Sequence, residues 1–418
     1  MTLFCLRDKC TLFLSTVLLT VLLLPQPTLA ADGACKIDEK ASIGIICGDA
    51  SLALSGRIHI DYLAFSRDDS DGALTDPINS GRASANDRRT RIALKGKVNK
   101  VLGYKFGYDF TSSTPIKDMY LNIKMSALNL RLGQFKMPFS LAEMTSSRFY
   151  PFTERPLTDD NVAIPGRKMG VGLFTKGSQW TWGMALHTDN YRNDDNRTES
   201  LFGFVTRLTY APWLEAKKGN YVHLGIGYRN ASNLEGNPAQ QDFDGHSPFS
   251  SAVLGTDIYS VKGQGLESFN VFNPEVAVGW GALGIQGELW TMSSSAEVSA
   301  HEVDMTAFYI QGLVWLTGEA NAYKDGAFKR VKPLKPLGEG GIGALGFAVR
   351  YQNTAFEADR VVGGGDKIDR SVNAVSIAAL WRMHAHVQLS FEYAFATRDI
   401  DGTETKPKGF QMRLGIDW

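Results

Sequence analysis

Apolar and polar residues alternate along most of the chain after residue 50, and the period of the alternation is two. In one stretch Ile92 and Leu94 fall on one face of an extended chain, whereas Arg89, Arg91 and Lys95 fall on the other. The same alternation returns at residues 104–110, 121–124, 180–186, 202–210, 222–228 and 387–395. Successive side chains of a β-strand point to opposite faces, so the pattern predicts strands with one apolar and one polar face.

Turn-forming residues separate these stretches, as an antiparallel meander requires. Examples are Asn99-Lys100, Lys176-Gly177, Lys218-Gly219 and Asp401-Gly402. Candidate strands between Leu54 and Trp418 number about sixteen, a count typical of a porin-sized barrel. Longer polar or irregular segments interrupt the meander at residues 76–86, 137–166, 231–251 and 324–339.

A soluble β-sandwich is the main alternative fold, because its strands alternate as well. Many of the predicted strands, however, approach the ~9–11 residues with which a tilted strand crosses a bilayer. The final stretch alternates from Phe410 to the terminal Trp418, and an aromatic C-terminal residue on such a strand resembles the signal read by the outer-membrane barrel assembly machinery. We therefore expect an all-β protein, in which residues 51–418 form an antiparallel transmembrane β-barrel in a bacterial outer membrane.

The first thirty residues have the pattern of a secretory signal peptide. Arg7 and Lys9 form a basic start, an apolar core follows, and Thr28-Leu29-Ala30 provides a small-residue cleavage site. Residues 31–50 then form an N-terminal segment that is too short for a plug domain. It contains Cys35 and Cys47, which we expect to form one disulfide, because such bonds persist outside the cytoplasm.

The net charge of the chain is close to zero. The full sequence has 44 Lys and Arg against 44 Asp and Glu, and the mature chain keeps 42 basic and 43 acidic residues. Bulk charge therefore does not favour nucleic-acid binding, and any preference for anions must come from where the charges lie. GxSxG and HExxH patterns are missing from the sequence, and apart from His384 and His386 the histidines are scattered. We expect neither an enzyme nor a cofactor or metal site.

Two sequence blocks resemble a known family. The first block is Leu132-Gly133-Gln134-Phe135-Lys136-Met137-Pro138-Phe139-Ser140-Leu141 with Thr145-Ser146-Ser147 and Phe152-Thr153-Glu154-Arg155; the second is Trp315-Leu316-Thr317-Gly318-Glu319 with Tyr323, Phe328-Lys329-Arg330, Gly343-Ala344-Leu345 and Arg350-Tyr351. Both are similar to the phosphate-selective porins O and P, and the resemblance runs from about residue 57 to Trp418. It implies a passive anion channel, for phosphate or similar small anions, that is a homotrimer of sixteen-stranded barrels. The barrel would lie among outer-membrane lipid and lipopolysaccharide.

The resemblance also implies that the third external loop folds into the lumen. In this chain that loop is residues 137–166, which follow the fifth predicted strand and have no periodicity of their own. A loop of about thirty residues is usually functional, and its aromatic content suggests that it packs against the barrel interior. The predicted pore-lining, anion-binding cations are Arg89, Arg91, Lys95, Lys136, Arg148, Arg155 and Arg167.

Each cation also has a structural interpretation. Arg155 could pair with a carboxylate of the barrel wall, and Arg167 could anchor the loop. Acidic residues occur in several predicted loops, so a general diffusion channel without selectivity is the alternative function, and an outer-membrane enzyme or a structural anchor are more distant ones.

Overall fold

The computed structural model describes residues 35–37, 43–66, 83–156, 164–188, 201–233, 266–296, 302–359, 368–400 and 402–418. The predicted signal peptide, residues 1–30, and residues 157–163 of the predicted inward loop lie outside this set. No helix among the described residues is both long enough and apolar enough to cross a membrane.

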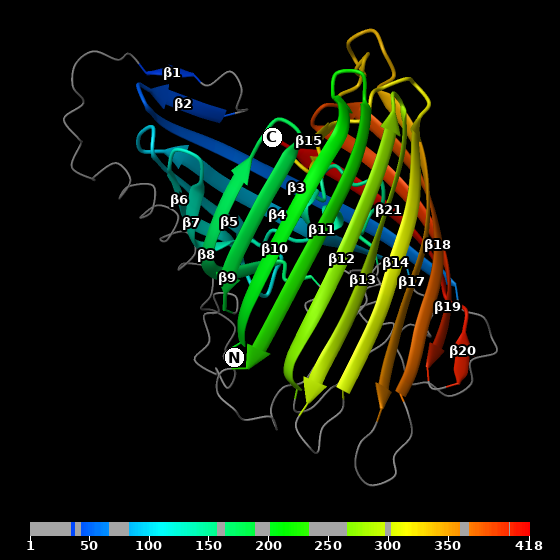
Figure 1. Ribbon diagram of the computed structural model, residues 1–418. Coiled ribbons are helices and arrows are strands. Elements are labelled where there is room, and N and C mark those ends of the chain that lie inside the picture. The colour runs from blue at the N-terminus through cyan, green and yellow to red at the C-terminus, as the bar shows by residue number, and fades with distance from the viewer. Residues whose placement is uncertain are drawn as a thin grey trace, which may run out of the picture.

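Sixteen antiparallel strands form a closed barrel (Figure 1). They are β3 (Ala50–Ser66), β4 (Ala83–Lys97), β5 (Leu102–Asp109), β6 (Ile116–Lys124), β7 (Asn129–Lys136), β8 (Arg167–Lys176), β9 (Trp180–His187), β10 (Leu201–Glu215), β11 (Asn220–Asn233), β12 (Leu266–Trp280), β13 (Leu283–Ala296), β14 (Glu302–Trp315), β17 (Ala344–Asp359), β18 (Ile368–His384), β19 (Val387–Ile400) and β21 (Lys408–Asp417). Strand β21 pairs with β3 from Asp417 and Arg57 to Lys408 and Ser66, which closes the ring. The predicted fold class is confirmed.

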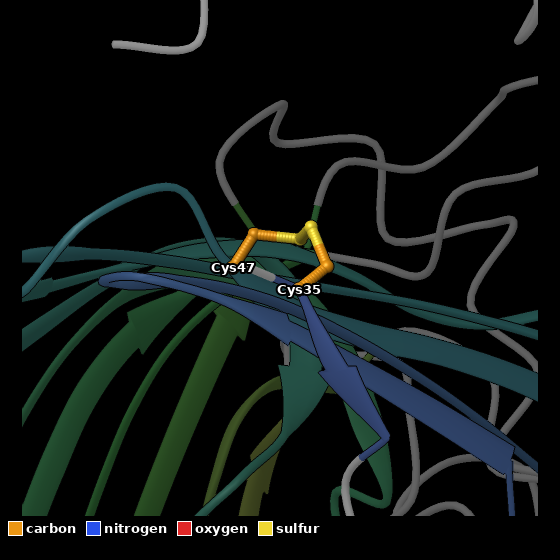
Figure 2. The surroundings of a disulfide bond; sticks show 2 residues. All are labelled: Cys35 and Cys47. Atoms are coloured by element: carbon orange, nitrogen blue, oxygen red, sulfur yellow. A yellow bond between two sulfur atoms is a disulfide. The ribbon is translucent and has the colours of Figure 1, made fainter. Parts of the chain in front are cut away.

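The remaining elements are short. They are β1 (Lys36–Ile37), β2 (Ile43–Cys47), α2 (Leu141–Met144), β15 (Tyr323–Lys324), β16 (Ala327–Phe328) and β20 (Thr403–Thr405). Strand β2 pairs with residues 50–54 of β3, before the point at which β21 joins β3, so β1 and β2 lie beyond the closed ring (Figure 1). A disulfide joins Cys35 to Cys47 in this part of the chain (Figure 2).

The two faces of the wall follow the predicted alternation. On β4, Ile92 and Leu94 are exposed on the outside and Arg89 is buried inside. On β21, Gln411 and Arg413 are buried inside, whereas the alternating row that includes Phe410 and Trp418 lies outside, as predicted. The ring of Trp418 lies so close to Gly56 that a Cβ atom there would be 2.2 Å from it, so any larger residue would displace the ring. An apolar outer face and a polar lumen are what a membrane barrel requires.

The two ends of the barrel differ in the length of their connections. At one end the strands are joined by short turns, such as residues 98–101, 177–179 and 281–282, and at the other by longer loops. In bacterial barrels the short turns face the periplasm, which assigns the upper end in Figure 1 to that side. One connection at this end is long: residues 316–343, between β14 and β17, which contain the β15–β16 hairpin.

Candidate functional site

The segment after β7 crosses the lumen of the barrel. The backbone N–H groups of Leu141 and Ala142 donate to the Glu288 carboxylate on β13, at 2.9 and 2.7 Å. Farther along, the N–H and hydroxyl of Thr153 donate to Glu392 on β19, at 2.8 and 2.6 Å. Because β7, β13 and β19 lie in different parts of the wall, these bonds hold the segment inside the barrel.

Apolar packing fixes the same segment. Met137, Phe139 and Leu141 are fully buried, and Tyr150 and Phe152 nearly so. The aromatic side chains of the loop therefore pack inside the barrel, as the sequence indicated.

Helix α2 begins in a strained conformation. Ser140 has a φ of 61°, which is uncommon for a residue other than glycine, and its hydroxyl accepts from Glu143 N at 3.2 Å as the N-cap. The hydrogen bonds to Glu288 hold the following residues in place, so the wall determines this turn.

Two acidic residues of the loop each form ion pairs with more than one cation. Glu143 pairs with Lys136 at 3.1 Å and with Arg155 at 3.0 Å. Burial raises the pKa of Glu143, but the charges of Arg155 and Lys136 outweigh burial and lower that pKa to about 2. Arg155 thus pairs with a carboxylate of the loop itself.

Glu154 is the second acidic centre. It pairs with Arg88 at 2.9 Å and Arg89 at 3.1 Å on β4, and with Arg413 at 2.6 Å on β21. Burial raises the pKa of Glu154, yet the three guanidinium groups hold it well below its usual range. The loop is therefore bound to the wall by buried ion pairs, which are strongly directional.

An open cavity of about 350 Å³ remains between the loop and strands β3–β8. Ten cationic side chains line it: Arg57, Arg89, Arg91, Lys105, Lys117, Arg131, Lys136, Arg148, Arg155 and Arg167. Asp118 is the acidic residue of this lining, whereas Glu143, Glu154 and Asp109 stand behind the cations and do not contribute to the cavity wall. We call this space the basic cavity.

Some of these cations are neutralised by carboxylates of the wall. Arg91 pairs with Asp109 at 2.5 Å, and Asp118 pairs with Lys105 at 2.9 Å and with Arg167 at 3.2 Å. Arg167 therefore does anchor the start of β8 to β6, in addition to lining the basic cavity.

Four cations of the cavity form no ion pair within the described part of the chain. Arg57 donates to the Ser147 hydroxyl at 2.7 Å, and Lys117 to the Ser112 hydroxyl at 2.6 Å. Arg131 lies over the rings of Tyr120 and Phe174, at 4.5 and 4.4 Å. Arg148 lies over Phe149 at 5.3 Å. Desolvation by burial lowers the pKa of Arg148 from its usual value; the charge of Asp417 opposes this shift and the charge of Arg330 adds to it.

The structure brings six of the seven predicted cations to one cavity. The exception is Lys95, which is exposed and lies outside the lining of this cavity, so its role in lining the pore stays a prediction. Lys95 lies four positions after Arg91, roughly 13 Å farther along the strand, and of the cross-strand pair Lys95 and Lys105 only Lys105 lines the cavity.

Sequence reasoning missed Arg57, Lys105, Lys117 and Arg131. Lys105 was recognisable, because it stands opposite Tyr104 and Phe106 in an alternating stretch. Arg131 carried the same signal between Leu130 and Leu132, although its contacts with the rings of Tyr120 and Phe174 were not visible in the sequence.

In contrast to the open cavity beside β3–β8, the lumen beside β10–β14 is filled by side chains of the wall and by the β15–β16 hairpin. Arg207 on β10 pairs with Glu275 on β12 at 2.6 Å and donates to the Gly326 carbonyl of the β15–β16 hairpin at 2.8 Å. The Tyr323 hydroxyl is 2.6 Å from Nδ1 of His223. Residues 324–339, expected as a loop, thus begin inside the barrel, where Phe328 N donates to Thr145 Oγ1 of the inward loop at 3.3 Å.

No group of three or more His, Cys, Asp or Glu residues within the described ranges is arranged to hold a metal ion.

Comparison with known proteins places these features in a family. A curated protein of Caulobacter vibrioides, described as uncharacterized, is 25% identical over 388 residues, covering 88% of this chain and 73% of its own. In vitro folded OmpT of Vibrio cholerae, in its trimer form, aligns with a TM-score of 0.54 at 10% identity, over 88% of this chain and all of that one. The anion-selective porin of Comamonas acidovorans gives the same values.

Because the sequence identities are low, these structural similarities establish the barrel fold and nothing further. The model of the phosphate-selective porin O and P family matches residues 52–418, which include every strand of the closed barrel apart from the first two residues of β3. The protein is therefore a channel of the bacterial outer membrane, and the chain belongs to the phosphate-selective porin O and P family.

Proposed function

We propose that this channel prefers small anions such as phosphate and that the basic cavity is its constriction. The observation that supports the proposal is the group of four cations, Arg57, Lys117, Arg131 and Arg148, that face the cavity without a carboxylate partner in the described residues. The basic cavity thus carries a local positive charge in a protein whose net charge is near zero.

Physical chemistry gives such a cavity a preference. Between protein walls the effective dielectric constant is lower than in bulk water and salt screens less, so a cation attracts an anion more strongly there. Arginine presents several N–H donors in a plane, a geometry that matches two oxygens of one phosphate. An arriving oxyanion would replace the neutral Ser147 hydroxyl as the partner of Arg57.

Weak binding is as important as attraction, because a channel must release its solute. The ion pairs of Arg89, Arg91, Lys105, Lys136, Arg155 and Arg167 partly cancel the charge of the cavity. This cancellation also supports the second candidate function, a general diffusion channel, in which the remaining charge has little influence on passing solutes.

Reversal potentials across a planar bilayer distinguish the two functions. The protein is inserted between two KCl solutions of different concentration, and the measurement is repeated with potassium phosphate. We expect a reversal potential of the sign that chloride permeation gives, and a lower chloride conductance when phosphate occupies the cavity. A reversal potential near zero would instead identify the general diffusion channel.

The family also supports proposals about assembly and export. We infer a homotrimer, in agreement with the trimer form of the similar OmpT structure, and we infer removal of residues 1–30 after export. The alternating β21 strand that ends in Trp418 is the segment that the barrel assembly machinery would bind. Native mass spectrometry of the outer-membrane protein tests both the oligomer and the first residue of the mature chain.

A further inference from the structure

The connection between β14 and β17 extends over the periplasmic rim of the barrel. Its first part contains the β15–β16 hairpin, which lies in the lumen beside Arg207 and His223. Its second part, residues 332–342, projects from the upper end in Figure 1, where it is drawn between yellow and orange. We call these eleven residues the rim tip.

The rim tip adjoins a row of apolar side chains on the outside of the barrel. Leu345 on β17, Trp381 on β18, Leu389 on β19 and Leu414 on β21 are direct neighbours across the sheet. Leu316 extends this row, since its N–H donates to the Leu345 carbonyl at 2.8 Å, and its side chain is 68% exposed. Outer rows of this kind face lipid in a membrane barrel.

Hydrogen bonds hold the rim tip against this row. The indole N–H of Trp381 donates to the Ile342 carbonyl at 2.7 Å, and Leu337 N donates to the Met383 carbonyl at 2.8 Å. Because the Trp381 side chain belongs to the outer row, its bond places Ile342 on the outside of the barrel. Tryptophan is common at the interface between membrane and water, where the ring is buried in lipid and the N–H is bonded.

The rim tip presents apolar side chains that the protein leaves uncovered. Leu334 is 68% exposed, Ile342 59% and Leu337 47%. Lys332 and Lys335 are exposed among them, and no ion pair joins either lysine to another described residue. Apolar groups beside long basic side chains suit the boundary between acyl chains and phosphate groups, which lysine reaches with an extended side chain.

We propose that the rim tip is embedded in the periplasmic leaflet of the outer membrane, with Leu334, Leu337 and Ile342 among the acyl chains and Lys332 and Lys335 at the lipid phosphates. The proposal depends on the continuity of the tip with the outer apolar row, which is lipid-facing for most of its length. One connection then contacts lipid at its tip and narrows the lumen with its hairpin. Bilayer contact would thereby stabilise the wall opposite the basic cavity.

Depth-dependent fluorescence quenching tests the proposal. The full mature chain carrying Leu337→Cys is labelled with a bimane probe, with Cys35 and Cys47 kept oxidised, and is reconstituted into vesicles of phosphatidylethanolamine and phosphatidylglycerol. A fraction of the lipid carries a nitroxide on the upper acyl chain. Val349→Cys, on the outer face of β17, is the lipid-exposed reference, and Lys218→Cys, in a turn at the same end of the barrel, is the water-exposed control.

We expect quenching at Leu337 close to that at Val349 and at least about twofold that at Lys218, because an interfacial residue lies near the upper acyl chain. Heat-modifiable migration of each variant in gels verifies that the barrel is intact. Quenching at Leu337 no greater than at Lys218 would overturn the proposal. Low quenching together with cross-linking of two Leu337→Cys chains by a short bismaleimide would overturn it as well, and would identify a second copy of the chain as the occupant.

Discussion

Charged side chains are arranged differently on the two sides of the lumen. Beside β10–β14, Arg207 is buried and paired with Glu275, and the β15–β16 hairpin contacts Arg207 through the Gly326 carbonyl. Beside β3–β8 the cations face an open cavity and four of them have no carboxylate partner in the described residues. The same residue type, arginine, thus stabilises the barrel on one side and is available to a solute on the other.

This difference explains how a chain with no net charge can carry a basic passage. Glu143 forms ion pairs with Lys136 and Arg155, and Glu154 forms one with Arg89. Neither carboxylate lines the basic cavity. A solute in the cavity meets the cations first. Substitutions on the two sides should therefore affect different properties.

The largest effect on stability should come from the filled side. Arg207→Ala leaves Glu275 buried without its partner, and breaking a buried pair typically costs ~3–5 kcal/mol. Denaturant unfolding in detergent micelles, followed by tryptophan fluorescence, measures the loss. Lys218→Ala removes an exposed pair and serves as the control, with little expected loss of stability. Equal stability of the two variants would show that Glu275 finds another partner.

The largest effect on selectivity should come from the open side. Arg148→Ala removes a cation that has no carboxylate partner, so the anion-to-cation permeability ratio should fall roughly fivefold, which corresponds to ~1 kcal/mol, the attraction of two unit charges about 4 Å apart in water. Arg89→Ala and Arg91→Ala should lower the ratio too, but they should also destabilise the protein, because Arg91→Ala leaves Asp109 without its cation and Arg89→Ala removes one of the three guanidinium groups around Glu154.

Lys95→Ala is the matched control for Arg148→Ala. It removes a cation from the inner face of β4, outside the basic cavity, and should change the ratio least. If reversal potentials of the Arg148 and Lys95 variants coincide, the basic cavity does not control selectivity.

Much of the open side was predictable from the alternation of residues. Because side chains alternate strictly along a strand, Arg89 and Arg91 had to face the lumen once Ile92 faced lipid. Alternation specifies the face but not the height along the barrel, so Lys95 was grouped with Arg89 and Arg91 although it does not line the cavity. Arg57 follows the same rule on β3 and was overlooked.

The pairing of charges was not predictable. Arg413 and Glu154 are 259 residues apart, and Arg207 and Gly326 are 119 apart. Such contacts depend on how residues 137–166 and 316–343 fold inside the closed barrel. The alternation of residues along one strand does not predict this. The inward part of residues 316–343 was hidden for this reason, since its lysines, prolines and glycines are typical of an exposed loop.

A smaller effect should appear with pH. The pKa of Glu143, about 2, lies below the ordinary value of about 4.3, so its ion pairs contribute to stability above that ordinary value and are lost as pH falls toward 2. Neutralising Glu143 would leave the charges of Lys136 and Arg155 unbalanced. Titration of Glu143 should therefore leave the anion-to-cation permeability ratio unchanged from pH 7 to about pH 4. It should raise the ratio only below about pH 3.

The variant Glu143→Gln provides the matched comparison for that titration. It imitates the protonated carboxyl and should show the higher anion preference already at pH 7. A ratio that rises near pH 5 in the parent but not in Glu143→Gln would show that Glu143 titrates in its ordinary range.

The smallest effect on the pore should follow loss of the Cys35–Cys47 disulfide. Strand β1 pairs only at Lys36 and Ile37 among its described residues, and β2 joins β3 before the ring closes, so neither strand belongs to the barrel wall. The bond closes a short loop, with a sequence separation of 12, and in the chain-entropy account it contributes ~3 kcal/mol to the hairpin alone. The double variant Cys35→Ser/Cys47→Ser should keep the conductance and reversal potential of the parent, while trypsin cleaves it faster after Lys36. Two free thiols in the non-reduced parent, measured by mass spectrometry after alkylation, would contradict the bond itself. A changed conductance in the double variant would instead place the hairpin in the path of the solute, and the division between a basic side and a filled side would then need a third component at the periplasmic mouth.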